Sequence, residues 1–508
     1  MIRTAILLSL AALCAAGIAA CGSSDEKTSS GPGLLIVGRT ADIDTLDPYA
    51  STAFQTEQTL ELIYGGLTGL DEKLDVVPGL ATSWKFSDGG KRLTFALRKG
   101  VRFADGSTFD SADVKASFDR LLDPKSGAVG ASNLSAVSAI QTPDPSTVVL
   151  SLKSADSSIP ASLAHINLSM LSADDIKART VGKETNGTGP FMLKSRIANQ
   201  RLTLVPNPNW WGPKVKVGGV EFRVIPNEKS VVSAVQSGNV QLGLLSDPLV
   251  AKTVPSGGGR KLVKIPSVNY HAFMLNARSP DLVDPRVRQA ISCAVDRQAV
   301  LDSAALGEGK VIGPITSPAY ESDANARPCP TPDLDEAKRL LAEAGKAGGL
   351  TIKAIVETGE YSTAVNEAQS LQAQLKKVGI DLKLDILEAG PYVKAWLAED
   401  FDAAVALNGG DADPNTMYGR YFTPGGSLNK QGLTNPKFTK LLDEGRAEVT
   451  PEQRKPVYAE FSRALEDIAP WVWLFSGNDY YYMSDKVKGF TPMPNASLQY
   501  LDKTSLSG

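Results

Sequence analysis

The chain has 508 residues, of which 42% are hydrophobic and 21% charged, and its formal net charge is -3 at pH 7. This length is too great for one compact core, so two or three structural units are expected. The nearly balanced charge argues against a nucleic-acid-binding protein. After residue 21, no run of about eighteen uninterrupted apolar residues, the length of a membrane span, occurs in the sequence.

The N-terminal residues have the composition of an export signal. Arg3 precedes a small and apolar run at residues 5–20, as in a secretory signal peptide. The end of this run, Ile18-Ala19-Ala20-Cys21, resembles a bacterial lipobox, which implies removal of residues 1–20 and lipidation of Cys21. The polar residues 21–33 are then a flexible tether, and the membrane contact depends on the lipid. The alternative is an ordinary cleavable signal with a cysteine nearby.

Two cysteines remain in the expected mature chain after the lipid acceptor, namely Cys293 and Cys329. Outside the cell, two thiols favour one disulfide, which would close a loop of about 36 residues. Two separate buried thiols are the alternative. No fixed-period repeat is visible.

The first half of the chain mixes strand and helix patterns. Apolar alternation or runs predict strands, and apolar residues at helical spacing predict helices. A turn cluster at residues 186–190 marks a boundary, and Gly238 stops a helix. The expected strands are 34–38, 93–98, 201–207 and 220–227, and the expected helices are 57–64, one that opens at 111–113, and 229–237.

From residue 284 onward helices and strands alternate, which predicts an α/β lobe. Thr331-Pro332 is a good helix start, followed by an apolar stripe that ends before Gly345. A second helix at 365–378 ends at Gly379. The expected strands are 350–356, 381–387 and a buried strand at 401–407.

Signals for catalysis or metal binding are missing from the sequence. The two histidines, His165 and His271, have no carboxylate or cysteine at ligand spacing, so neither a metal site nor a cofactor is expected. No GxSxG elbow, HExxH helix or P-loop occurs. We therefore expect no catalytic residue and no enzyme; a surface hydrolase or a structural lipoprotein is the competing class.

A polar loop directly after the strand at 401–407 is the best candidate for ligand binding. It contains Asn408, Gly409, Asp411 and Asp413, and loops at strand ends carry ligands in α/β lobes. The alternative is that both aspartates only stabilise a turn. The aromatic residues Trp471, Trp473 and 480–482 could stack on a ligand, but their sequence is more typical of core strands.

Several longer motifs together resemble the family 5 extracellular solute-binding proteins, the oligopeptide and dipeptide receptors of bacterial ABC importers. They span most of the expected mature chain. The motifs are Pro78-Gly79-Leu80-Ala81 with Trp84, the segment 93–124, NGTGPF at 186–191, and the segments 227–243 and 284–297.

The resemblance implies an α/β fold with two lobes, like the periplasmic binding proteins of type II and cluster C, and an inserted subdomain in the first lobe. Lobe I would be discontinuous and comprise residues 34–70, 185–269 and 485–508. The inserted subdomain would be 71–184, and lobe II 270–484. A solute would be enclosed between the lobes, with the closed form favoured by binding.

The resemblance also implies a function and a site. A monomeric receptor would capture short peptides and deliver them to the permease subunits of an ABC transporter, while anchored by lipid on the extracytoplasmic face of the cytoplasmic membrane. Asp411 would take the α-ammonium of the peptide, although Asp413 can be aligned instead. Phe54 and Thr52 would form the first-lobe wall.

Asn408 and Gly409 would offer amide or backbone contacts in the same loop. No arginine can be matched to a peptide carboxylate, so the ligand length is undetermined. The family also resembles binders of oligosaccharides, nickel or other metal complexes, and haem, which are the alternative solutes. Trp396, Trp471 and Trp473 would be the stacking platform for a sugar.

Overall fold

The computed structural model describes residues 33–507, except residues 256, 330, 331, 359, 360, 427 and 431. The predicted signal peptide, the lipid acceptor Cys21 and all but the last residue of the predicted tether lie outside the described residues. Among the helices that are described, none is long and apolar enough to cross a membrane.

A seven-stranded sheet is built from both ends and the middle of the chain. Its strands are β1 (Leu34–Arg39), β8 (Phe191–Ile197), β9 (Arg201–Pro206), β10 (Gly219–Val224), β11 (Leu242–Leu245), β12 (Arg260–Pro266) and β19 (Asn478–Ser484). Their order is β12-β19-β11-β1-β10-β9-β8, and β1 runs parallel to both of its neighbours. The sheet thus joins segments that are far apart in the sequence.

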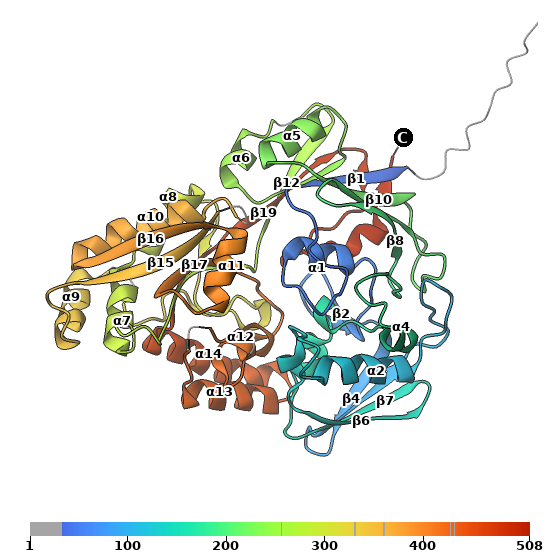
Figure 1. Ribbon diagram of the computed structural model, residues 1–508, viewed down its shortest axis with the longest axis horizontal. Helices are drawn as coiled ribbons and strands as arrows, with labels where there is room; N and C mark the ends of the chain where they lie inside the picture. The colour runs from blue at the N-terminus through green and yellow to red at the C-terminus, as the bar shows by residue number, and fades with distance from the viewer. Residues whose placement is uncertain are drawn as a thin grey trace, which may run out of the picture. The chain divides into compact units, whose positions relative to one another are not determined.

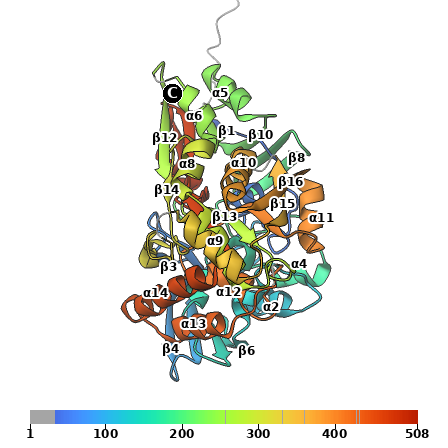
Figure 2. The same ribbon diagram turned by 90° about the vertical axis from the view of Figure 1, so that its left-hand side faces the viewer.

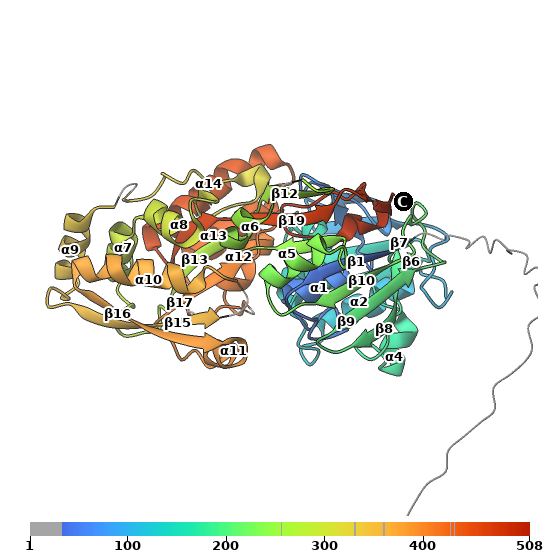
Figure 3. The ribbon, with the colours of Figure 1, turned by 90° about the horizontal axis from the view of Figure 1, so that it is seen from above.

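Helix α5 (Glu228–Gln236) packs against β1 and β11 of this sheet (Figure 3). The Asn227 side chain caps it by accepting a 2.9 Å hydrogen bond from the Ser230 backbone N–H. Val231, Val232 and Val235 form its buried face. Since the helix ends just before Gly238, the sequence-based prediction of a helix there is confirmed.

A separate four-stranded antiparallel sheet lies within the predicted inserted subdomain. It consists of β4 (Ala81–Ser87), β5 (Arg92–Leu97), β6 (Val137–Asp144) and β7 (Thr147–Leu152), in the order β4-β5-β7-β6. Helix α2 (Ser111–Leu122) packs against β6 and β7 through Val114, Phe118 and Leu121. Two short strand pairs complete this half: β2 (Thr68–Leu70) with β3 (Val76–Pro78), and β20 (Val487–Lys488) with β21 (Ser505–Leu506).

The third large sheet has six strands and carries the predicted binding loop. Its strands are β13 (Tyr270–Leu275), β14 (Lys310–Val311), β15 (Leu350–Thr358), β16 (Ile380–Glu388), β17 (Ala403–Asn408) and β18 (Trp471–Ser476). They are ordered β14-β18-β13-β17-β15-β16. The predicted buried strand before the polar loop is therefore confirmed as β17, at the centre of the sheet.

Helices cover both faces of the six-stranded sheet, because its strands are apolar on both sides. In β13, Tyr270 and Ala272 belong to one buried cluster and Phe273 to the other. The helices of this half are α7 (Pro285–Ala294), α8 (Arg297–Ala305), α9 (Leu334–Glu343), α10 (Ala364–Leu375), α11 (Ala389–Leu397), α12 (Pro414–Phe422), α13 (Pro436–Ala447) and α14 (Pro451–Ile468). Figure 1 shows α10 beside β16 and α8 beside α10, and Figure 2 shows α13 and α14 side by side.

The remaining helices belong to the other half of the chain. They are α1 (Phe54–Leu60), α3 (Ile159–Ser162), α4 (Ala173–Ala178) and α6 (Pro248–Thr253). Helix α1 starts three residues before the predicted one and ends at Leu60 rather than at residue 64.

The chain passes between the seven-stranded and six-stranded sheets twice, at residues 267–269 and at Gly477. The two crossing segments are hydrogen bonded to each other: the Ser267 backbone N–H donates to the Gly477 carbonyl at 3.0 Å, and the Ser476 hydroxyl donates to the Asn269 carbonyl at 2.8 Å. The predicted return to lobe I at residue 485 therefore comes one strand too late. Since β19 (Asn478–Ser484) pairs with β11 and β12, it belongs to the first sheet.

The aromatic residues of β18 and β19 lie in the core. Trp471 and Trp473 are fully buried, and residues 480–482 are also buried. The prediction that these residues form core strands is confirmed, and neither tryptophan can offer a face to a sugar ligand. These side chains therefore belong to the cores behind the two large sheets.

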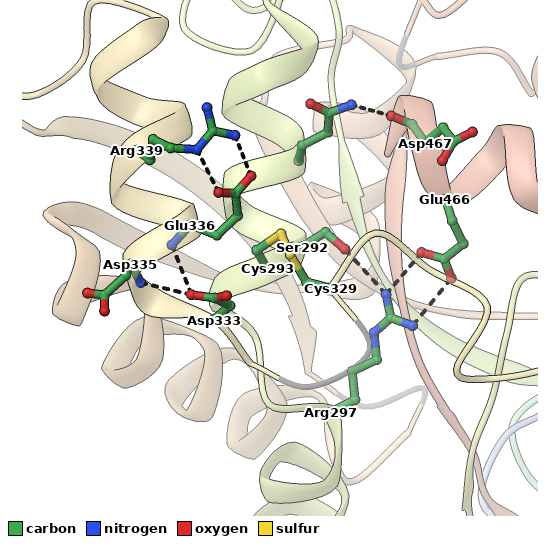
Figure 4. The surroundings of a disulfide bond; sticks show 11 residues. Ser292, Cys293, Arg297, Cys329, Asp333, Asp335, Glu336, Arg339, Glu466 and Asp467 are labelled. Atoms are coloured by element: carbon green, nitrogen blue, oxygen red, sulfur yellow. Dashed lines mark hydrogen bonds and ion pairs between the residues drawn. A yellow bond between two sulfur atoms is a disulfide. The ribbon is translucent and has the colours of Figure 1, made fainter.

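Cys293, at the end of α7, is joined to Cys329 by a disulfide with Cα atoms 5.1 Å apart (Figure 4). The bond closes a loop with a sequence separation of 36. Next to it, Arg297 and Glu466 form a buried ion pair at 3.3 Å. The bond therefore constrains a segment outside the regular elements against the core of the second half.

Replacing both cysteines by alanine should lower the free energy of unfolding by about 3 to 4 kcal/mol, because the unfolded chain regains loop entropy. The measurement is urea denaturation of the wild type and of the Cys293→Ala/Cys329→Ala variant. Reductant should lower the wild-type midpoint and leave that of the variant unchanged. Equal midpoints for oxidised wild type and variant would contradict this expectation.

Candidate functional site

A cavity of about 270 Å³ lies between residues that follow β1 and residues that follow β17. From the first half of the chain it is lined by Thr52, by α1 residues including Phe54 and Glu57, and by His165. From the second half it is lined by the loop after β17 and by Arg420 of α12. Loops at the ends of sheet strands thus meet in one hollow, which is the usual place for a ligand in α/β proteins.

Five of the six residues predicted to bind ligand line this cavity. They are Thr52, Phe54, Asn408, Gly409 and Asp411. A Cβ atom added at Gly409 would meet nothing within 4 Å, so the backbone there is open to the cavity. The sixth residue, Asp413, is not part of the lining.

Asp413 has a structural role instead. The residue is 2% exposed, and its side chain caps α12 by accepting a 2.9 Å hydrogen bond from the Asn415 backbone N–H. Its second oxygen lies 2.6 Å from Nη1 of the buried Arg454. Because both oxygens are engaged, the prediction that Asp413 serves as a turn residue fits this aspartate, whereas Asp411 faces the cavity.

Asp411 is half-buried in the cavity wall, and its hydrogen bonds compensate only part of the cost of removing the carboxylate from water. Its Oδ1 accepts a 2.6 Å hydrogen bond from the backbone N–H of Ala412. Burial raises its pKa to about 7, although this hydrogen bond and the charge of Arg420 lower the value. A cation placed in the cavity would favour the ionised form of Asp411.

Two glutamates that line the cavity, Glu57 and Glu61, were not predicted from the sequence. Burial raises the pKa of Glu57 to about 8 and that of Glu61 to about 7. Glu61 accepts hydrogen bonds from the Ser497 hydroxyl at 2.7 Å and from the Leu498 backbone N–H at 2.5 Å. Their spacing of four residues places both on one side of a helix, which is the signal that could have revealed them.

His165 does not neutralise Glu57. Its Nε2 lies 3.9 Å from a Glu57 oxygen, but burial and the charge of Arg420 lower the pKa of His165 to about 4. The imidazole is therefore neutral at neutral pH, and the pair is not a salt bridge under those conditions. The cavity wall keeps an excess of acidic groups, since Glu357 also lines it and Arg420 is the one arginine among the described lining residues.

Aromatic side chains complete the wall. Tyr361, Tyr392, Trp396 and Tyr421 line the cavity, and Trp396 stacks on Phe401 with ring centroids 5.0 Å apart. Asn408 accepts a 3.2 Å hydrogen bond from the Tyr421 hydroxyl, which fixes its amide. Within the described part of the chain, no group of three or more histidine, cysteine, aspartate or glutamate side chains could hold a metal ion.

Stability without ligand should fall as the pH rises from about 5 to 8. The folded protein holds protons on Glu57, Glu61 and Asp411 at pH values where the unfolded chain has released them, so folding becomes less favourable as those protons leave. Thermal unfolding of the wild type and of Glu57→Gln across this range should show a shallower decline in the variant. Identical slopes would show that Glu57 ionises normally in the folded state.

Comparisons with known proteins agree with this arrangement. The family model "Bacterial extracellular solute-binding proteins, family 5 Middle" matches residues 75–429. The glutathione-binding protein GsiB of Salmonella choleraesuis is 24% identical over 488 residues, which cover 92% of this chain and 94% of GsiB.

Two solved structures are similar over nearly their whole length. AgaA from A. tumefacien R10, in complex with agropinic acid, has a TM-score of 0.85 and 27% identity, covering 94% of this chain and 99% of AgaA. DppA from Helicobacter pylori, in complex with the peptide STSA, has a TM-score of 0.83 and 24% identity, covering 94% and 98%. The predicted two-lobe α/β fold is thereby confirmed.

Proposed function

The chain belongs to the bacterial extracellular solute-binding proteins of family 5, and from this membership we propose that it captures short peptides and delivers them to the permease of an ABC importer. At the level of the family, these proteins are solute receptors of ABC importers and not enzymes. The observation that carries the peptide assignment is the position of Asp411 in the wall of an acidic cavity.

A peptide fits the cavity for electrostatic reasons. Its α-ammonium would pair with Asp411, whose carboxylate lacks an ion-pair partner within 4.0 Å among the described side chains. Asn408 and the open backbone at Gly409 would bind peptide amide groups. Burying an ammonium requires such a partner, and the acidic excess of the wall favours a cationic group. The relatives GsiB and DppA, which bind glutathione and a peptide, support the same ligand class.

Opening and closing would accompany capture. The two crossing segments at residues 267–269 and Gly477 are the connections between the two large sheets, and hydrogen bonds tie them together. We place the hinge there, with lobe I returning at Asn478 and the inserted subdomain at about residues 71–184. A ligand that touches both halves would favour the closed form because it binds that form better.

The anchoring part of the proposal depends on residues outside the described part of the chain. Lipidation of Cys21 would hold a monomeric receptor on the extracytoplasmic face of the cytoplasmic membrane. The lipobox resemblance supports this assignment, and the family supports an extracytoplasmic location. Metabolic labelling with a fatty acid should mark the wild type and not Cys21→Ala.

A small solute other than a peptide is the second candidate, since AgaA was solved with agropinic acid. The test is isothermal titration of protein that has been unfolded and refolded to remove carried-over solute. The panel contains peptides, oligosaccharides and metal chelates. Saturable binding of peptides, with the peptides recovered intact, supports the proposal. Binding confined to another class would keep the receptor function and replace the ligand.

A further inference from the structure

The arginine of the cavity offers a second charge for the ligand. Arg420 lies in the last turn of α12 and is half-buried in the cavity wall. Its Nε is buried and donates no hydrogen bond to any described residue. No carboxylate of a described residue lies within the 4.0 Å that defines an ion pair with it. The guanidinium therefore keeps donor capacity that a ligand can use.

Arg420 is also the electrostatic neighbour of the two acidic groups expected to hold an ammonium. Burial raises the pKa of Glu57 and of Asp411, and the positive charge of Arg420 lowers both values again. Burial lowers the pKa of Arg420 itself, and the charges of Glu57 and Asp411 contribute to raising it. Glu57 comes from α1 and Asp411 from the loop after β17. The wall of the cavity thus combines a guanidinium with two carboxylates, and no ion pair within 4.0 Å joins Arg420 to either carboxylate.

We propose that this cavity binds a zwitterionic α-amino-acid head, with the ligand's ammonium at Asp411 and Glu57 and its α-carboxylate at Arg420. Such a head carries both charges on one carbon and would satisfy both kinds of wall group together. The N-terminus of an ordinary peptide has an ammonium beside a neutral amide carbonyl, so it leaves the guanidinium without an anion. Arginine is suited to this role because its planar fork matches a carboxylate. The proposal rests on the proposed peptide-receptor function.

The substrate class that follows is a short peptide linked through the side chain of its first residue, so that the α-carboxylate of that residue is free. The isomers γ-Glu-Ala and α-Glu-Ala provide a matched pair of probes. They have the same atoms and the same net charge, and they differ in whether a carboxylate or an amide sits beside the ammonium. Because the isomers also differ in the distance from the ammonium to the alanine carboxylate, the contribution of the group next to the ammonium is read from how the preference changes when Arg420 is replaced.

Isothermal titration of ligand-free wild type should show that γ-Glu-Ala binds at least about tenfold more tightly than α-Glu-Ala. Arg420→Gln should abolish the preference by weakening the γ isomer selectively. Arg420→Lys keeps the charge without the planar fork, so it should retain part of the preference. The melting temperature of each variant without ligand shows whether it folds, and Arg420→Lys keeps the test valid if Arg420→Gln does not.

Equal affinity for the two isomers, preference for the α isomer, or an equal loss for both in Arg420→Gln would overturn the zwitterion proposal and leave the peptide-receptor function in place. Failure of every peptide, including both isomers, to bind the wild type would overturn the receptor proposal itself. The two failures are therefore distinguishable in one titration series.

Discussion

Replacing Asp411 by asparagine should weaken peptide binding by about 2–5 kcal/mol, as is typical when one partner of a buried charge pair is removed. The substitution keeps the size of the side chain and its ability to accept a hydrogen bond from the Ala412 N–H. It removes the charge that would balance the ligand's ammonium. Isothermal titration with one peptide against wild type and variant measures the difference.

The pH dependence of binding gives an internal control for this experiment. Because burial raises the pKa of Asp411 to about 7, a peptide ammonium competes with a proton for this carboxylate below that pH. Wild-type affinity should therefore increase between pH 6 and pH 7.5, and the increase should be smaller in Asp411→Asn. Unchanged affinity in the variant at pH 7.5 would show that another group holds the ammonium.

The second large effect concerns stability. Asp413→Asn should destabilise the protein by about 3–5 kcal/mol, because Arg454 would keep a buried charge without its partner at 2.6 Å. Asparagine is as good an N-cap as aspartate, so the cap of α12 is retained and the loss reports on the ion pair. Chemical denaturation of wild type and Asp413→Asn measures it.

Substitutions of the two aspartates should affect different properties, peptide affinity for Asp411 and stability for Asp413. Asp413→Asn should change the affinity of the folded protein for peptide far less than Asp411→Asn does, while Asp411→Asn should leave the unfolding midpoint nearly unchanged at low pH, where Asp411 is protonated. The opposite pattern, with normal stability and lost affinity in Asp413→Asn, would assign the ammonium site to Asp413.

Local patterns in the sequence were sufficient to predict much of the fold and part of the candidate site. The apolar run at residues 401–407 and the polar loop after it predicted β17 and the position of Asp411, because a buried strand and its following loop are encoded within a few residues. The choice between Asp411 and Asp413 was not encoded locally. It depends on Arg454, which reaches Asp413 from a distant helix, α14.

The other features that could not be predicted depend on contacts between segments that are far apart in the sequence. Strands β18 and β19 both contain a run of aromatic residues, so only the pairing of β19 with β11 and β12 shows that the chain has already returned to the first sheet. Arg420 and Glu57 belong to helices from different halves of the chain and meet at one cavity only in the folded protein. The spacing of Arg420 and Glu57 along the sequence does not indicate that they line the same cavity.

The measurement that tests the central claim most directly is the melting temperature of the ligand-free protein with a peptide library and with the same library acetylated at the N-terminus. A ligand that binds only the folded protein must raise the melting temperature. We expect free peptides to raise it and acetylated peptides, which lack the ammonium, to have little effect. Equal shifts with both libraries, or no shift with either, would contradict a peptide site organised around Asp411.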